Sequence, residues 1–133
     1  MNTNEKTVLL FAYGTLMSGF GNNRLIEDQK LIGAGETSEQ YTMYGSGIPF
    51  VNENEKTSTI KGELWEVTNE RLPSVDGLEG HPNWYQRKLI PVIVDGEEHQ
   101  AWLYFNNDKG GNKIENGDFR EFRKKVNNSY GSR

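Results

Sequence analysis

The stretch Thr7-Val8-Leu9-Leu10-Phe11-Ala12-Tyr13-Gly14-Thr15-Leu16 decides the fold, because a short apolar run passes directly into a glycine turn. Four consecutive apolar residues predict a buried β-strand over Thr7–Ala12. Backbone N–H groups at such a turn lack partners in a sheet and can converge on an anion, and Gly14 allows a ligand to approach closely. Spacing alone favours the simpler interpretation, an ordinary strand end with Tyr13 at the mouth of a barrel.

Strand signals recur further along the chain. Alternating apolar and polar residues predict a strand over Ser58–Val67 with one buried face. A hairpin follows, with strands over Trp84–Val94 and His99–Phe105 joined by the turn Asp95-Gly96. Two segments remain: Leu31–Tyr44 is interpreted as extended and irregular, and Asn106–Gly117 is interpreted as a polar loop.

Three short helices are predicted from their end signals. Their expected positions are Asn22 or Asn23 to Gln29, Thr68 or Asn69 to a stop at Gly80, and from Asp118 onward with Phe119, Phe122 and Val126 on the apolar face. Mostly strands with two or three short helices indicate an α+β domain around a mixed or barrel-like sheet. A length of 133 residues fits one domain over residues 1–133.

The composition excludes several classes of function. Fifteen basic against 19 acidic residues give a net charge of −4 with no basic stripe, so nucleic acid is not an expected partner. No apolar run is long enough for a membrane span. The absence of cysteine removes thiol nucleophiles, and His81 and His99 are not at ligand spacing, so no metal is expected. The polar start Met1–Lys6 is no secretory leader, and we expect a cytoplasmic protein.

A second candidate for chemistry is Glu79, at the predicted end of the middle helix. Leu72, Val75 and Leu78 are spaced three apart and are expected to face the core. Glu79 follows about 100° further round, at the edge of that core. Partial burial and the negative end of the helix dipole would both raise its pKa. A surface glutamate beside a C-cap glycine is the commoner outcome for such a residue.

Other polar residues are weaker candidates. Asp76 is the competing carboxylate, three residues before Glu79. His81 is interpreted as a solvated turn residue. The remaining residues lie on predicted strands, where pairing or packing is their usual role, although a tyrosine among them could bind substrate: Glu63, Tyr85, Arg87 and Tyr104.

Taken in order, these pieces resemble the γ-glutamylcyclotransferase-like superfamily, over roughly residues 7–105. The resemblance rests on Tyr13-Gly14-Thr15-Leu16, Gly19, Asn22, Arg24-Leu25, Lys61-Gly62-Glu63-Leu64-Trp65-Glu66-Val67, Asp76-x-x-Glu79-Gly80, Trp84-Tyr85-x-Arg87 and Ala101-Trp102-x-Tyr104. Tyr-Gly-Thr-Leu is most similar to the γ-glutamylamine cyclotransferase (AIG2-like) branch. That branch often has basic residues where this chain has Met17-Ser18, which leaves the substrate open.

The resemblance implies a small mixed β-barrel flanked by short helices. It also implies that Tyr13, Gly14, Thr15 and Leu16 hold a γ-glutamyl group and that Glu79 is the catalytic acid/base. The expected activity is release of 5-oxoproline from a γ-glutamyl amine or γ-glutamyl-amino acid, by an enzyme of acyltransferase or lyase type. The expected partner is thus the small-molecule substrate, and the protein is expected to be a monomer or weak homodimer.

This chemistry matches what the chain offers. The substrate's own α-amine attacks its γ-carbonyl, so neither a protein nucleophile nor a cofactor is required, and positioning supplies much of the rate. A glutamate of ordinary pKa, ~4.3, would take a proton from an α-ammonium of ~8 at a cost of roughly 5 kcal/mol, whereas a pKa of ~7 would leave about 1.4 kcal/mol. Amides of the Tyr13–Leu16 turn are the expected donors to the oxyanion.

Two alternatives stay open from the sequence. One is removal of a γ-glutamyl protecting group in a biosynthetic pathway, by the same cyclisation. The other is a non-catalytic small-molecule-binding module on the same fold. The part of the pocket that receives the leaving amine is expected within Leu31–Asn54.

Overall fold

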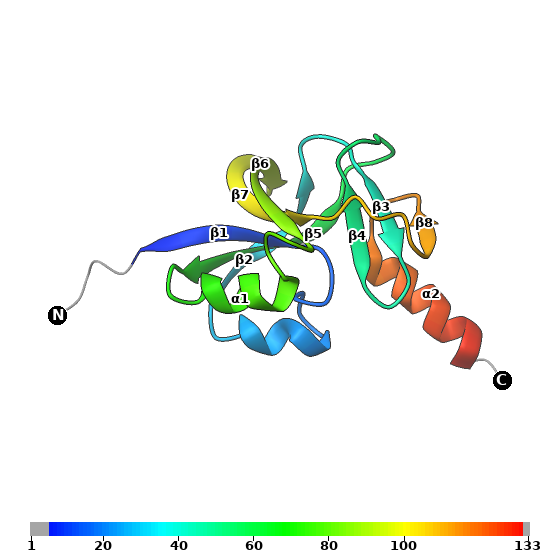
Figure 1. Ribbon diagram of the computed structural model, residues 1–133, viewed down its shortest axis with the longest axis horizontal. Coiled ribbons are helices and arrows are strands. Elements are labelled where there is room, and N and C mark those ends of the chain that lie inside the picture. The colour runs from blue at the N-terminus through cyan, green and yellow to red at the C-terminus, as the bar shows by residue number, and fades with distance from the viewer. Residues whose placement is uncertain (1–5, 132–133) are drawn as a thin grey trace.

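The computed structural model describes residues 6–131 and has a five-stranded closed barrel at its centre (Figure 1). The barrel strands, in spatial order, are β1 (Thr7–Ala12), β5 (Lys61–Thr68), β2 (Lys30–Thr37), β6 (Gln86–Val94) and β7 (Glu97–Phe105). Neighbours are antiparallel except β1 and β7, whose parallel pairing at Leu10 and Trp102 closes the barrel. The predicted mixed barrel is confirmed. The polar residues Met1–Glu5 lie outside the described residues.

A smaller sheet lies at one end of the barrel, next to the C-terminal helix (Figure 1). It consists of β4 (Pro49–Asn52), β3 (Thr42–Gly45) and β8 (Asn112–Ile114), in that order. The segment interpreted as extended and irregular therefore contains β2 and β3, and the one interpreted as a polar loop contains β8. The strands of the small sheet are only three or four residues long, too few to show a period, and β8 exists through its pairing with β3, about seventy residues away.

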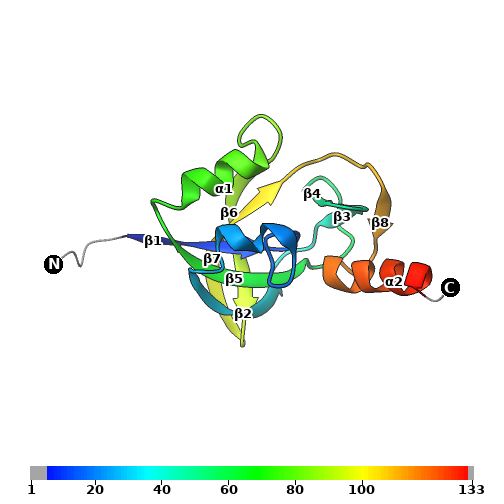
Figure 2. The ribbon, with the colours of Figure 1, turned by 90° about the horizontal axis from the view of Figure 1, so that it is seen from below.

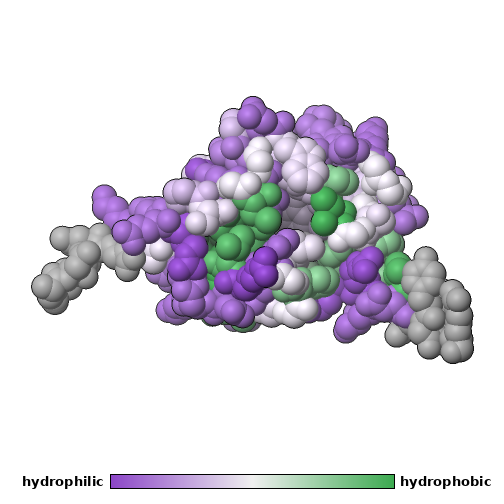
Figure 3. Space-filling model, turned by 60° about the horizontal axis from the view of Figure 1, so that its bottom comes forward, coloured by the Kyte–Doolittle hydropathy of each residue, from purple (hydrophilic) through white to green (hydrophobic). Residues whose placement is uncertain are grey.

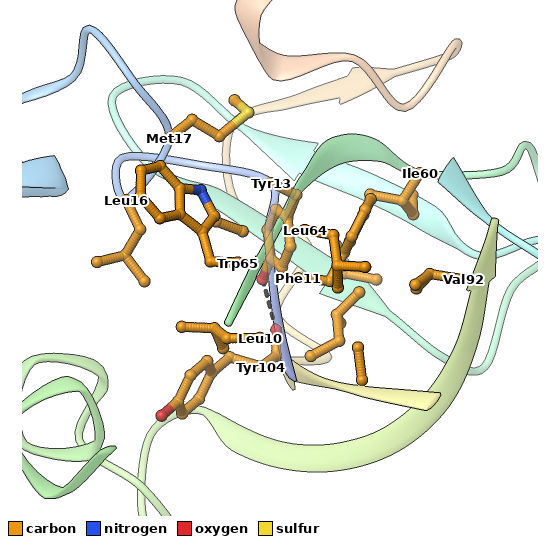
Figure 4. Packing of buried hydrophobic residues seen from close by; sticks show 14 of the residues in the cluster. Leu10, Phe11, Tyr13, Leu16, Met17, Ile60, Leu64, Trp65, Val92 and Tyr104 are labelled. Atoms are coloured by element: carbon orange, nitrogen blue, oxygen red, sulfur yellow. Dashed lines mark hydrogen bonds between the residues drawn. The ribbon is translucent and has the colours of Figure 1, made fainter. Parts of the chain in front are cut away.

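The barrel interior is filled by side chains from every strand. Figure 4 shows this packing around β1, where Leu10 and Phe11 meet residues of β5 and β6. The fully buried members include Leu10, Phe11, Leu64, Val67, Val92 and Leu103. The β6–β7 hairpin turns at Asp95 and Gly96 with φ of 51° and 79°, the positive values that a tight type I′ turn requires, as the sequence predicted.

Three helical segments lie outside the barrel: α1 (Leu72–Glu79), α2 (Phe119–Gly131) and a short 3₁₀ helix (Gly21–Leu25). α1 begins at Leu72, later than the expected start at Thr68 or Asn69, with Pro73 in its first turn. Gly80 ends it with φ of 68°, as predicted. The helix predicted to end at Gln29 is shorter in the structure, a 3₁₀ helix that ends at Leu25. Asp118 accepts the N–H of Glu121 and caps α2 as expected. Within the described residues, no helix has the length and apolar character needed to traverse a bilayer.

The 3₁₀ helix and α1 lie on the same side of the barrel, where Figure 2 shows both in front of the strands. Arg71, at the start of α1, joins them. Its Nη1 donates to the carbonyl oxygen of Leu25 at 2.7 Å and contacts the Asp28 carboxylate at 2.6 Å. This clamp fixes α1 beside the loop that follows β1, and so brings together the two segments that the sequence singled out.

Candidate active site

A cavity of about 130 Å³ opens between the loop after β1, the end of α1 and the start of β4. All five predicted site residues line it. The complete lining is Phe11, Ala12, Tyr13, Gly14, Thr15, Leu16, Asn22, Ile48, Pro49, Leu78, Glu79, Trp84, Tyr85 and Tyr104. Figure 3 shows a hollow on this side of the molecule with green, hydrophobic surface beside it. The structure therefore brings the loop and the carboxylate to one site.

The loop Tyr13–Leu16 is a turn with free backbone donors. The N–H of Met17 donates to the carbonyl oxygen of Gly14 at 3.0 Å and closes the turn. Within residues 6–131, the N–H groups of Gly14, Thr15 and Leu16 have no hydrogen-bond partner. Buried N–H groups are normally paired, so a short run of unpaired ones at a cavity is typical of an anion site.

Two asparagines of the next segment hold this loop. The side-chain amide of Asn22 donates to the Thr15 hydroxyl at 2.8 Å, and that of Asn23 donates to the carbonyl oxygen of Leu16 at 2.8 Å. Asn22 also lines the cavity. In both contacts the asparagine donates to an oxygen of the loop. These hydrogen bonds therefore fix the orientation of the turn and leave its backbone N–H groups available.

Gly14 lies against Pro49 so closely that a Cβ at position 14 would lie 2.7 Å from the proline Cγ and 2.9 Å from its Cδ. The proline ring cannot rotate away. We expect Gly14→Ala to cost about 1–2 kcal/mol of unfolding free energy, as overpacking does, and to displace one wall of the cavity. Urea unfolding measures the first effect. Gly47→Ala, whose added Cβ would meet nothing within 4 Å, is the matched control. Equal stability of the two variants would contradict this packing.

Glu79 is the last residue of α1 and shares the buried side of that helix. It lies seven residues after Leu72 and four after Val75, both buried, so all three fall on one face. The prediction that Leu78 faces the core was wrong, since Leu78 is 37% exposed at the cavity rim. Each step of three residues falls 60° short of a full turn, so Leu78 lies about 120° from Leu72.

Burial raises the pKa of the Glu79 carboxyl from its ordinary value to about 7. Within the described residues, no hydrogen bond or ion pair stabilises its charged form. The predicted rise is thus confirmed, and burial accounts for it. A carboxylate with a pKa of about 7 gives up and takes protons with little loss at neutral pH.

The same burial makes folding stability depend on pH. Because the pKa of Glu79 is higher in the folded chain than in the unfolded chain, the folded state holds the proton more tightly between about pH 4.5 and 7. Stability therefore falls as pH rises through that window. We expect the stability of Glu79→Gln relative to wild type to rise by about 2.5 kcal/mol between pH 5 and pH 8. Urea unfolding at both pH values measures this, and an equal difference at both would contradict the burial.

Three buried tyrosines form the inner walls of the cavity. The Tyr13 hydroxyl donates to the carbonyl oxygen of Tyr104 at 2.5 Å, as Figure 4 shows, and the Tyr85 hydroxyl donates to that of Pro49 at 2.8 Å. Burial, with a further contribution from the nearby Glu79 charge, raises the pKa of Tyr13 and of Tyr85. They remain neutral at physiological pH, so they shape the cavity and do not act as bases.

Asp76, the competing carboxylate, has a different role. It accepts hydrogen bonds from Arg87 Nε at 2.8 Å, from Arg87 Nη2 at 3.1 Å and from the Tyr104 hydroxyl at 2.6 Å. Burial alone would raise the pKa of Asp76, but these hydrogen bonds and the Arg87 charge outweigh it and hold that pKa below its ordinary value. Asp76 does not line the cavity. It anchors α1 to the β6–β7 hairpin, as the structural interpretation of Arg87 predicted.

Glu63 is a structural residue as well. Its Oε1 accepts the N–H of Ser18 at 2.8 Å, and its Oε2 contacts Arg120 of α2 at 3.2 Å. Arg120 also donates to the carbonyl oxygen of Ser18 at 2.8 Å. Among residues 6–131, no three side chains of ligating type gather where they could hold a metal ion.

The sequence interpretation missed several cavity residues. Ile48 and Pro49 come from the segment expected to receive the leaving amine, whereas Asn22 and Trp84 were not assigned to the pocket. Trp84 was placed on a strand, but β6 begins only at Gln86. No local signal separates Trp84, which is 52% exposed, from the neighbouring Tyr85, which is buried although it also precedes β6.

Fold and site together define a small barrel protein in which one cavity is lined both by a buried carboxylate of raised pKa and by the turn Tyr13–Leu16. The profile of the family described as "Gamma-glutamyl cyclotransferase, AIG2-like" matches residues 10–121. The chain belongs to this family, which is of γ-glutamylcyclotransferase type.

Relatives from three branches of life are similar to the chain. A Methanocaldococcus jannaschii protein with a provisional γ-glutamylcyclotransferase name is 46% identical over 116 residues, covering 86% of this chain and 97% of its own length. The γ-glutamylaminecyclotransferase of Rattus norvegicus is 33% identical, covering 71% and 75%. The γ-L-glutamyl-butirosin B γ-glutamyl cyclotransferase of Niallia circulans is 27% identical, covering 86% and 76%.

A solved structure agrees with the fold. The crystal structure of an AIG2-like protein from Mus musculus superposes with a TM-score of 0.68 at 26% identity, covering 75% of this chain and 77% of the other. The barrel with its flanking helices is thus shared with a member of the same family.

Proposed function

We propose that the protein cyclises the γ-glutamyl group of a γ-glutamyl amine or γ-glutamyl-amino acid, releasing 5-oxoproline and the free amine. The observation that carries this proposal is the position of Glu79. Its carboxylate has a pKa of about 7, is unpaired among the described residues, and lines the same cavity as the free N–H groups of Gly14 to Leu16. Family membership supports the same reaction type.

In this reaction Glu79 moves protons between two nitrogens of the substrate. Its carboxylate first accepts a proton from the α-ammonium, and the resulting amine attacks the γ-carbonyl carbon. Glu79 donates this first proton to the leaving nitrogen and then takes the second proton that the attacking nitrogen loses as the ring forms. It passes that second proton to the amine that departs when the old C–N bond breaks, so the amine leaves as an ammonium and Glu79 is again a carboxylate. With a pKa of about 7, the first transfer from an α-ammonium of pKa ~8 costs about 1.4 kcal/mol, close to the ideal for a shuttle.

The turn Tyr13–Leu16 supplies the complementary charge. Attack on the carbonyl places negative charge on its oxygen, and preorganised N–H donors stabilise that charge without rearrangement. Among the described residues, the amides of Gly14, Thr15 and Leu16 have no hydrogen-bond partner, and Asn22 and Asn23 hold the turn through the Thr15 hydroxyl and the Leu16 carbonyl oxygen. Enclosure by Tyr13, Tyr85 and Tyr104 keeps the substrate folded toward ring closure. The reaction proposed here uses no cofactor.

A substrate panel tests this proposal. The protein is incubated with γ-glutamyl-amino acids and with γ-glutamyl-ε-lysine, and 5-oxoproline is measured by mass spectrometry. Release of 5-oxoproline from at least one compound supports the proposal. Binding of these compounds without turnover would instead support a binding module on the same fold.

A second substrate class belongs in the same panel. The Niallia circulans relative is named for its action on a γ-glutamyl-butirosin, and it matches 86% of this chain. A γ-glutamyl-protected aminoglycoside therefore tests whether the leaving amine is a biosynthetic intermediate. Faster turnover of that compound than of the amino-acid derivatives would assign the protein to protecting-group removal.

A further inference from the structure

The outer part of the cavity carries large apolar side chains that are left exposed. The structure describes five exposed large hydrophobic residues, and three of them line this cavity: Ile48 at 38%, Leu78 at 37% and Trp84 at 52%. We call these three the apolar rim. Exposed apolar surface that gathers around one opening indicates an apolar ligand at that place.

The apolar rim lies next to the reacting end of the cavity. Leu78 is the neighbour of Glu79 in α1. The N–H of Trp84 donates to the carbonyl oxygen of Gly80 at 2.8 Å, and the N–H of Tyr85 donates to that of Glu79 at 3.2 Å. In the proposed reaction the leaving nitrogen must come within reach of the Glu79 carboxylate, and the apolar rim lines the same cavity as that carboxylate.

Trp84 packs against two neighbouring aromatic rings. Its ring packs edge-on against Tyr85, with centroids 4.9 Å apart, and against Phe50 at 6.3 Å. A prearranged aromatic surface loses little entropy when a ligand packs on it, and an aromatic ligand gains specific edge or offset contacts there.

The charges around the cavity point the same way. Among the described residues that line it, Glu79 is the only ionisable side chain apart from the neutral tyrosines. A charged group two carbons from the leaving nitrogen would find no charged partner among these lining residues, because Glu79 is engaged with the α-ammonium. A phenyl group at the same place would cover the apolar rim.

Resting on the proposed function, we propose that the apolar rim is the leaving-group subsite and that it selects apolar, preferably aromatic, amines over charged ones. Trp84 is then a specificity-determining residue. The substrate class is a γ-glutamyl amide of an arylalkyl or branched alkyl amine.

Four amides of γ-glutamate test this selection: the methylamide, the 2-phenylethylamide, the 2-aminoethylamide and the 2-carboxyethylamide. We expect kcat/KM for the phenylethylamide to exceed that for either charged amide by about tenfold or more, the effect of one well-placed apolar group. Trp84→Ala should lower the ratio of kcat/KM for phenylethylamide over methylamide by about tenfold. Leu89→Ala, an equally exposed apolar residue outside the cavity, should keep the wild-type ratio.

The outcomes separate the subsite from the reaction. Turnover of all four amides at similar kcat/KM, or an unchanged ratio in Trp84→Ala, would overturn the subsite and leave the reaction intact. No 5-oxoproline from any amide would overturn the reaction. In that case, calorimetric binding of the amides to Glu79→Gln tests the subsite independently of the reaction. Tighter binding of the phenylethylamide than of the charged amides supports the subsite, and equal binding overturns it.

Discussion

Replacing Glu79 with glutamine should lower kcat/KM for 5-oxoproline formation by about 10³-fold, within the range that a positioned general acid–base supplies. Glutamine keeps the shape and hydrogen-bonding size of the side chain but cannot take a proton from the α-ammonium. Substrate binding should persist, because the turn Tyr13–Leu16 and the tyrosine walls are untouched. The measurement is kcat/KM for a γ-glutamyl amide, together with its binding constant by calorimetry.

Two controls make this loss interpretable. Glu70→Gln, an exposed change just before α1, should keep wild-type activity. Glu79→Gln itself should be more stable than wild type at pH 8, because it removes a buried charge, so lost activity could not be attributed to unfolding. Activity above a tenth of wild type would contradict the assignment of Glu79. Asp76 would be a poor substitute as the base, since three hydrogen bonds hold it as a carboxylate.

Replacing Arg87 with alanine should lower the free energy of unfolding by about 3 kcal/mol at pH 7, because it leaves the carboxylate of Asp76 without its charged partner in a largely buried position. The two side chains are each 19% exposed and form a bidentate contact. The change also removes the guanidinium from its place 4.3 Å from the centre of the Trp102 ring. Urea unfolding measures the loss.

The neighbouring pair Lys88–Glu53 supplies the matched control. Its lysine is 46% exposed, so Lys88→Ala should cost no more than about 0.5 kcal/mol. A double-mutant cycle of Asp76→Ala and Arg87→Ala should show coupling of at least about 1 kcal/mol. Because the pKa of Asp76 is lowered in the folded chain, this stability is present above the ordinary aspartate pKa and is lost as pH falls through the lowered value. Equal costs for Arg87→Ala and Lys88→Ala would contradict the anchoring role.

Much of the barrel could be predicted because its signals are local. The apolar run of β1, the turn Asp95-Gly96 and the stop at Gly80 each depend on a few adjacent residues, and each lies where expected. The small sheet could not be predicted in this way. Its strands are three or four residues long, and they are defined by pairing between segments far apart in the chain.

In the candidate site, too, local features could be predicted and contacts between distant segments could not. The loop and Glu79 were placed together by the order of motifs, and the structure puts both at one cavity. The spacing of Glu79 to Leu72 and Val75, seven and four residues, predicts its inward direction better than its position next to Leu78 does. By contrast, Pro49 packs on Gly14 across a separation of 35 residues, and nothing local in either segment indicates that contact.

The central claim is that a γ-glutamyl group closes on itself under control of Glu79 and does not react with water. The most direct test is product analysis by mass spectrometry after turnover of γ-glutamyl 2-phenylethylamide in ¹⁸O-labelled water. Cyclisation predicts one 5-oxoproline for each amine released, with no ¹⁸O incorporated. Glutamate carrying ¹⁸O in its γ-carboxyl group would show hydrolysis and would contradict the proposed reaction.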